Sequence, residues 1–462
     1  MKILHTKLRE KGVILKMEYN AFKEAVISAA RASGIAEYEL YYNAGEDVSV
    51  DVFKHEINEF SSSADGGVCF RCVVDGKMGY ASTEELSEEQ AISLVARAVD
   101  NAGTLETEER EYLAAGGLEY ETLDLKPYAL PTTEELINTA LKGERAVYDA
   151  DPAVIDGSSA GAACGSVKIA ICNSNGLDLS YENNMATFYA QSVVSNGKEM
   201  SDGFEVNVGS FDKLDVGELA KKATDEALSM LDADVAPTGA YPVVFAPDAM
   251  SSLLATFSGI FSAENAQRGL SRLGGKEGEV VASDIVTLVD DPFHPESAMP
   301  INFDGEGSPT HKKNVIENGT FKTLLYNLKT AATAGVQTTG NAARSYNSTV
   351  GIRPFSMYIA PGDKTEDQIL EEVGEGVYIT SLGGLHAGAN VVSGDFSLQS
   401  SGHMIEGGKK GRAVKSFTVA GNFYALLGGI TAIGSELKLR SRGITSFSSP
   451  CVRVDGLTVA GK

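Results

Sequence analysis

Apolar residues near the start of the chain recur at the three- and four-residue spacing of a helix that buries one face. Phe22 and Val26 lie on such a face, and Gly34 follows it, as glycine often does where a helix ends. Alternating apolar and polar residues then predict strands, and Asp75-Gly76 predicts the turn of a hairpin. The expected elements are a helix at 18–33, strands at 39–42, 48–53, 68–74 and 78–81, and a helix at 88–102.

The same order of elements appears a second time. An acidic, irregular stretch at 104–132 contains two prolines and predicts a long excursion rather than a boundary between domains. The pattern then predicts a helix at 133–149, strands at 154–159, 166–173 and 177–194, and a helix at 216–231. Two successive helix–strands–helix units indicate an internal duplication. We therefore expect one N-terminal domain of layered helices and strands at 17–232.

Residues 232–239, with Pro237, form the expected linker to a second, strand-rich domain at 233–462. Asn318-Gly319, Gly407-Gly408 and Asp455-Gly456 each predict a hairpin there. Only two helices are expected, at 248–261 and 366–373, and Asp248 is expected to cap the first. So many hairpins favour a closed, barrel-like sheet, because closure removes exposed strand edges. The expected fold class is α+β.

Residues 1–16 are basic, contain one short apolar patch and have no cleavage site of small residues. This composition differs from that of a signal peptide or a membrane anchor. We expect a disordered extension that precedes the folded protein.

The formal net charge of −24 argues against direct binding of nucleic acid, because an acidic surface repels the phosphate backbone. No apolar stretch approaches the roughly 20 residues that cross a membrane. Cys69 and Cys72 have the spacing of a metal or redox pair, but they lie in an alternating, strand-like run. We expect free thiols in the reducing cytoplasm.

The C-terminal half contains an ordered series of short segments with turn-forming and acidic residues. The segments are Tyr241–Pro247, Ile301–Thr310, Val315–Gly319, Thr339–Arg344 and Val392–Ser397. Together they resemble the TldD/PmbA family of metallopeptidase-related proteins. Shorter segments at 59–61 and 79–82 resemble the same family more loosely, so the match extends over nearly all of 17–462.

The resemblance implies a zinc peptidase built from two related subunits, of which the catalytic one carries a His-Glu-x-x-x-His motif on a helix. That motif supplies imidazole ligands and a carboxylate that activates water. In this chain its three positions are Ala255, Thr256 and Ile260. None provides a ligand or a general base at neutral pH. The cysteine ligand that the family resemblance places near the C-terminus is also missing from 435–449, and Cys451 lies in the last expected strand.

Two other groups of residues are candidates for a site. His386, Asp395 and His403 lie in one glycine-rich segment, and two histidines with one carboxylate suit zinc or iron. Gly383, Gly384, Ser393 and Gly394 lie in the same segment. Because glycines allow close backbone approach, an extended peptide could add there as a strand. Simple turns and polar surface are the alternatives for both groups.

The reading that the resemblance favours is a cytoplasmic, PmbA/TldE-like subunit without catalytic residues or a cofactor of its own. Zinc is then expected in a TldD-like partner, with which this chain forms a heterodimer that processes unfolded or modified peptides. In isolation the chain could form a homodimer. Two alternatives stay open: an active metallopeptidase that uses His386, Asp395 and His403, and a non-enzymatic protein-binding modulator of the DNA-gyrase type.

Overall fold

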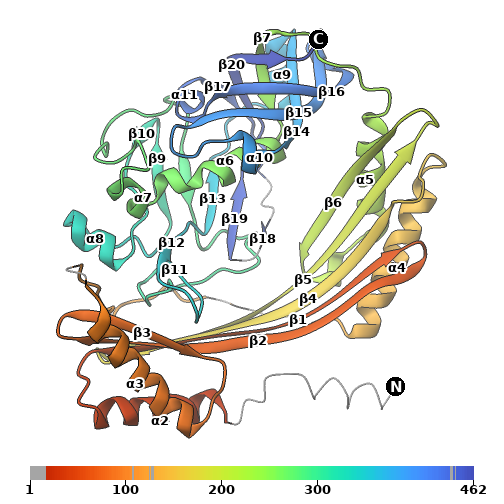
Figure 1. The fold of residues 1–462 in the computed structure, drawn as a ribbon. Helices are drawn as coiled ribbons and strands as arrows, with labels where there is room; N and C mark the ends of the chain where they lie inside the picture. Colours follow the sequence, from red (N-terminus) through yellow and green to blue (C-terminus); the bar gives the residue numbers. More distant parts are fainter. Residues whose placement is uncertain (1–16, 107–108, 124, 126–128, 438–440, 443) are drawn as a thin grey trace.

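A computed structural model describes residues 17–106, 109–123, 125, 129–437, 441–442 and 444–462 (Figure 1). The extension expected at 1–16 lies outside the described residues. Within them, the five cysteines are buried and free, which confirms the expectation of free thiols. No helix in this described part is long and apolar enough to cross a membrane.

The N-terminal half is built on one long, curved antiparallel sheet with the strand order β3-β2-β1-β4-β5-β6 (Figure 1). Its strands are β1 (Tyr38–Phe53), β2 (Glu56–Val74), β3 (Lys77–Thr83), β4 (Ser159–Asn173), β5 (Asp178–Ser195) and β6 (Met200–Gly209). Helices α2 (Tyr19–Ala32) and α3 (Glu88–Thr104) cover one end of the sheet, and α4 (Thr133–Ala150) and α5 (Val216–Ser229) cover the other. A 3-10 turn, η1 (Phe211–Lys213), precedes α5. Whether the two ends arose by duplication stays a prediction.

The strands are longer than their apolar patterns predict. The two strands expected at 39–42 and 48–53 are one strand, because β2 and β4 pair with β1 on both sides across its polar middle. The strand expected at 154–159 is wrong: Val154 forms only an isolated bridge with Val194, and β4 begins at Ser159. Strand β6 was not predicted, although Phe204, Val206 and Val208 alternate with polar residues as in a strand; within Met200–Gly209 only Gly203 is buried.

Successive residues of β1 point to opposite faces of the sheet, as in any strand. Leu40 packs with Phe22 and Phe70 beneath α2 and α3. Tyr41 lies on the other face, where it joins residues such as Phe303 from the C-terminal half. The alternation of apolar residues therefore builds two cores, one under the helices and one between the two halves of the molecule.

The main C-terminal sheet has the order β16-β15-β14-β7-β20-β17, and an additional pairing of β16 with β20 closes it. This confirms the expected barrel. The strands are β7 (Gly239–Phe245), β14 (Gly376–Gly383), β15 (Asp395–Glu406), β16 (Lys409–Asn422), β17 (Ile430–Ile433) and β20 (Val452–Ala460). A second sheet contains β8 (Leu288–Asp290), β9 (Lys313–Glu317), β10 (Thr320–Phe321), β13 (Ser356–Ile359), β18 (Ser441–Arg442) and β19 (Thr445–Ser448), and β11 (Ala342–Ala343) pairs with β12 (Gly351–Ile352).

Two of the three predicted C-terminal hairpins are confirmed, at Asn318-Gly319 and Gly407-Gly408. The third is wrong, because residues 452–460 form the single strand β20. Gly456 has a φ of 78°, and the register with β7 shifts between Val454 and Leu457, so this glycine serves a bulge rather than a reverse turn.

The helices of the C-terminal half also differ from expectation. Besides α6 (Pro247–Phe257) and α9 (Glu366–Val373), the chain forms the short helices α7 (Ala263–Gln267), α8 (Leu328–Ala334), α10 (Leu385–Gly388) and α11 (Phe423–Gly428). Each is too short to show a helical period. Helix α6 ends at Phe257 and continues as a 3-10 turn, η2 (Ser258–Phe261). Asp248 does not cap α6, because the N-cap residue is Ala246 and Pro247 begins the helix.

Candidate functional site

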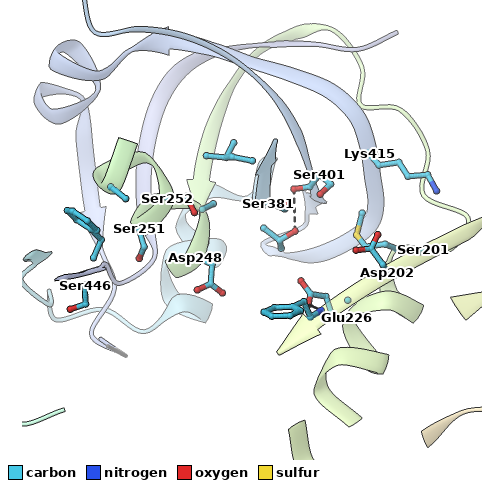
Figure 2. Close-up of a pocket in the computed structure, with 18 of the residues that line it drawn as sticks. Ser201, Asp202, Glu226, Asp248, Ser251, Ser252, Ser381, Ser401, Lys415 and Ser446 are labelled. Atoms are coloured by element: carbon cyan, nitrogen blue, oxygen red, sulfur yellow. Dashed lines mark hydrogen bonds between the residues drawn. The ribbon is translucent and has the colours of Figure 1, made fainter. Parts of the chain in front are cut away.

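A cavity of about 500 Å³ lies where the N-terminal sheet meets the barrel (Figure 2). Edge strand β6 and helix α5 form one wall, and α6, β14, β15, β16 and β19 form the others. Its lining residues are Met200, Ser201, Asp202, Gly203, Phe204, Glu226, Met230, Asp248, Ala249, Ser251, Ser252, Ala255, Thr380, Ser381, Leu382, Ser401, Lys415, Thr445, Ser446 and Phe447. The set is rich in serine and carboxylate side chains and contains no histidine and no cysteine.

The three positions of the zinc motif have different surroundings. Ala255 lines the cavity. The hydroxyl of Thr256 donates a hydrogen bond to the carbonyl of Ser252 at 2.8 Å, back along its own helix. Ile260 is 1% exposed and belongs to the barrel core. None of these side chains is a metal ligand, and in the described part of the chain no three His, Cys, Asp or Glu residues are grouped to hold a metal ion.

The alternative trio is not brought together. Asp395 and His403 lie eight positions apart on β15, which at the rise of a strand separates them by about 26 Å. His386 lies on α10, in a separate element. Burial lowers the pKa of His403, and its Nδ1 lies 3.4 Å from the carbonyl oxygen of Gly411. A hydrogen bond from Asn422 lowers the pKa of the Asp395 carboxyl.

The four glycine and serine candidates lie at turns around α10 and the start of β15. Gly384 has a φ of 71° and begins α10. Gly394 has a φ of 82°, and a Cβ there would lie 2.5 Å from the ring of Tyr424. The carbonyl of Ser393 accepts a hydrogen bond from Asn422 at 2.8 Å. These three positions have clear structural roles, whereas Gly383 ends β14 beside the cavity.

One edge of β14 is open at the cavity. Strand β7 pairs with β14 only from Val377 to Ile379, because the chain leaves β7 at Phe245 and turns into α6. Residues 380–383 extend past that point, and among the described strands none pairs with them on that side. Thr380, Ser381 and Leu382 line the cavity. A strand edge is thus one wall of the cavity.

The charged residues of the lining are predominantly acidic. Figure 2 shows Asp248 of α6 on one side and Asp202 of β6 with Glu226 of α5 across from it. A Glu226 oxygen accepts a hydrogen bond from the backbone N–H of Phe204 at 3.1 Å, which holds the side chain against β6. Among the described residues of the lining, the cationic side chain is that of Lys415, and its Nζ lies 2.7 Å from a Glu199 oxygen outside the lining.

A second polar cluster lies between the two halves, and we call Glu39, Arg71, Asp304, Glu306 and Arg344 the ionic junction. Arg71 is fully buried and donates from Nε and Nη2 to the two Glu39 oxygens at 2.8 and 3.0 Å. Arg344 donates to the same carboxylate from the C-terminal half. The Nη1 atom of Arg71 lies 3.6 Å from Glu306. The ionic junction therefore joins the sheet to the C-terminal half.

Asp304 and Glu306, the two acidic residues of the ionic junction that come from the C-terminal half, lie in one tight turn. Asp304 accepts hydrogen bonds at 2.9 Å from the backbone N–H groups of Glu306, Ser308 and Ala342. Burial nevertheless raises the pKa of Asp304 to about 6 and that of Glu306 to about 7. Within the segments that carried the family resemblance, these residues serve to join the halves rather than to line the cavity.

Sequence reasoning missed most of the cavity. Asp202 and Glu226 lie in the N-terminal half, and Lys415 and Ser446 follow long after α6 in the sequence, so no motif spacing links them. The signals came from the family resemblance, at Ala255, and from the glycine-rich end of β14, at Gly383 beside the lining residue Leu382.

Comparisons with known proteins cover most of the chain. Family models of PmbA/TldA metallopeptidases match it as domain 1 at residues 38–102, a central domain at 126–231 and a C-terminal domain at 238–461.

Individual relatives match over nearly their full lengths. A Thermotoga maritima crystal structure, described as that of a modulator of a DNA gyrase, is 30% identical, covers 96% of this chain and all of that chain, and has a TM-score of 0.87. TldE from Thermococcus kodakarensis is 25% identical, with 95% and 100% coverage and a TM-score of 0.85. A Haemophilus influenzae metalloprotease PmbA homologue is 25% identical over 95% of this chain and 94% of its own length.

Proposed function

Because the chain belongs to the PmbA/TldD metallopeptidase family, we propose that it is a non-catalytic, PmbA/TldE-like subunit that holds extended peptides for a zinc-bearing, TldD-like partner. The partner would supply the metal and the water-activating carboxylate. This chain would form part of the wall of an enclosed chamber, which excludes folded proteins.

The observation that carries the proposal is the chemistry of α6. Ala255 faces the cavity where the family motif places an imidazole, and Ile260 is buried in the core where the motif places another. A zinc site needs three or four N, O or S ligands at about 2.0–2.3 Å. The cavity lining offers carboxylates on opposite walls but no imidazole or thiolate, so these residues do not fit the zinc site of the motif.

A role in holding peptides is supported by the open edge of β14. A peptide that adds as a strand forms its hydrogen bonds through backbone groups, so it binds with little dependence on sequence. Only an unfolded segment has those groups free. The cavity beside residues 380–383 would therefore accept extended chains and reject folded domains.

The test is to purify the chain alone, incubate it with zinc, desalt it and measure both bound metal and hydrolysis of an unstructured fluorogenic peptide. We expect no retained zinc and no hydrolysis. Addition of the TldD-like subunit from the same organism should give a complex on gel filtration and peptidase activity. A partner variant with its motif glutamate replaced by glutamine is the control and should form the complex without activity.

A stoichiometric zinc ion with hydrolysis by the isolated chain would overturn the non-catalytic assignment. Failure to associate with the TldD-like subunit, in the presence or absence of peptide, would overturn the proposed partnership. A homodimer that dissociates when the TldD-like subunit is added would agree with the proposal, because the heterodimer would then be the preferred assembly.

A further inference from the structure

Arg353 lies in the interior between the two halves and has no acidic partner. Asn341 fixes its backbone: the Arg353 N–H donates to the Asn341 carbonyl at 3.0 Å, and Asn341 Nδ2 donates to the Arg353 carbonyl at 3.0 Å. Its Nε is buried without a hydrogen-bond partner, and among the described residues no carboxylate forms an ion pair with it. Burial lowers the pKa of Arg353, and the Tyr41 hydroxyl opposes this effect. The position of Arg353 is therefore fixed, whereas the described residues do not compensate its charge.

A second arginine beside it has donors that are not used. The Arg344 side chain is fully buried, and its Nη2 donates to Glu39. Its guanidinium lies over the ring of Tyr41, 4.2 Å from the ring centre. Within the described part of the chain, its Nε and Nη1 have no hydrogen-bond partner. Glu39 thus balances the charge of Arg344 and leaves two of its nitrogen atoms without an acceptor.

Both arginines line one small cavity of about 20 Å³, where the concave face of the sheet meets the C-terminal half. A volume of about 10–15 Å³ is enough for one water molecule, so a particle of that size fits here. Arg353 is partly exposed, so its guanidinium can be reached from solvent. Asp304 also belongs to the lining, but its oxygens already accept three backbone hydrogen bonds. The rest of the lining is mainly apolar, with side chains such as Phe303 and Phe355.

We propose that this cavity is a binding site for a small monovalent anion of about the size of chloride, held between Arg353 and Arg344. Such an ion accepts hydrogen bonds from any direction, so it suits donors that converge from two side chains. It also supplies the negative charge that Arg353 lacks, which a neutral water molecule does not. Sulfate and phosphate do not fit into this volume. Because the ion contacts residues of both halves, it strengthens their packing beside the ionic junction.

Thermal unfolding of the full chain tests the site in solution. Chloride replaces gluconate in steps at a constant ionic strength of about 200 mM, so that general screening stays unchanged. We expect the unfolding temperature of the natural chain to rise by about 3 °C and to level off by about 100 mM chloride, because the ion binds only the folded state. Bromide should act in the same way.

Two variants separate the site from general effects of salt. R353M should show no saturable rise with chloride. In gluconate it should be at least as stable as the natural chain, because the substitution removes a buried charge that nothing compensates. The matched variant R97M removes an exposed arginine of α3, outside the lining, and should keep the full response to chloride.

Crystals of the natural chain locate the ion directly and do not depend on the folding of any variant. Crystals grown without halide and soaked in sodium bromide should show an anomalous difference peak in the cavity, between Arg353 and Arg344. Bromide peaks confined to the protein surface would mean that a water molecule occupies the cavity, and would overturn the proposal. An equal rise in unfolding temperature of the natural chain and R353M would overturn it as well, because chloride would then act elsewhere.

Discussion

The cavity and the ionic junction are both polar, but they differ in how closely opposite charges are paired. At the ionic junction, Glu39 accepts from both Arg71 and Arg344, and Asp304 accepts three backbone hydrogen bonds. At the cavity, Asp202, Glu226 and Asp248 lie around an open space. In the ionic junction, Nε and Nη1 of Arg344 have no hydrogen-bond partner among the described residues, so opposite charges at close range, rather than complete hydrogen bonding, hold that cluster together.

This difference between the two sites indicates which part of the structure is formed by the segments that carry the family resemblance. The segments of Asp304, Glu306 and Arg344 are among those that together carry the resemblance, and they build the junction between the halves. At the positions of the His-Glu-x-x-x-His motif that the resemblance implies, this chain has Ala255, Thr256 and Ile260. On the proposed function, the chain keeps the fold of the family without the catalytic residues of that motif.

The largest expected effect comes from breaking the ionic junction. Arg71→Met leaves Glu39 and Glu306 buried beside a neutral side chain, and loss of one partner of a buried ion pair costs about 3–5 kcal/mol. Urea unfolding should show this loss. The double variant E306Q/R71M should recover part of it, because no uncompensated Glu306 charge remains and Glu39 keeps its pairing with Arg344. Two variants whose losses simply add would contradict the interaction.

The next prediction compares the stability cost of a substitution at two motif positions, Ala255 on α6 and Ile260 on η2. Ile260→His should cost about 2–4 kcal/mol, because Ile260 is enclosed in the barrel core. Ala255→His should cost less than about 1 kcal/mol, since Ala255 lines the cavity and is partly exposed. Thermal unfolding of the two variants measures the contrast. If the Ile260 variant retained full stability, the distinction between cavity and core at this helix would be wrong.

A smaller effect is expected from protonation of Glu306. Burial raises its pKa from 4.5 to about 7, so the folded state holds this proton more tightly than the unfolded state. The stabilisation is fully present below pH about 4.5 and is lost as pH rises through about 7, by roughly 1–3 kcal/mol. Asp304, with a pKa raised to about 6, changes stability in the same direction.

Glu306→Gln should remove much of this dependence, since a neutral side chain keeps an acceptor for the Leu328 N–H and does not titrate. Urea unfolding between about pH 5 and 8 compares the free energy of unfolding of the natural chain with that of Glu306→Gln. The Glu39 carboxyl has a lowered pKa, so its contribution is lost only at more acidic pH, below this range. If the stability of Glu306→Gln fell equally steeply with rising pH, the pH dependence would have to come from another group.

The sequence predicted those parts of the fold in which a local pattern is strong. Helix α3 and the turn at Asp75-Gly76 follow from spacing and turn chemistry, and the barrel follows from the density of hairpins. The middle of β1 was missed because its polar residues are held by the neighbouring strands rather than by burial, whereas β6 was missed although Phe204, Val206 and Val208 show the alternation of a strand.

The site was less predictable than the fold. The Ala255, Thr256 and Ile260 positions could be found by resemblance, but the cavity walls come from segments that lie about 200 residues apart in the chain, such as Asp202 and Lys415. Apposition of that kind arises from packing and leaves no local signal. The same limit explains why the metal site predicted at His386, Asp395 and His403 does not form. These residues are near in sequence, but an extended strand separates Asp395 from His403.

The smallest expected effects test whether the glycine-rich segment belongs to the cavity or to the scaffold. Gly394→Ala places a methyl group 2.5 Å from Tyr424 at a φ of 82° and should cost about 2 kcal/mol. Gly384→Ala, at a φ of 71° with open space around it, should cost only about 1 kcal/mol. Thermal unfolding and peptide anisotropy on the same samples give both quantities. Since both glycines serve turns, neither change should alter the affinity for an unstructured, labelled peptide. If Gly384→Ala abolished peptide binding while its stability fell by no more than this amount, the peptide path would run past α10 as well as along β14.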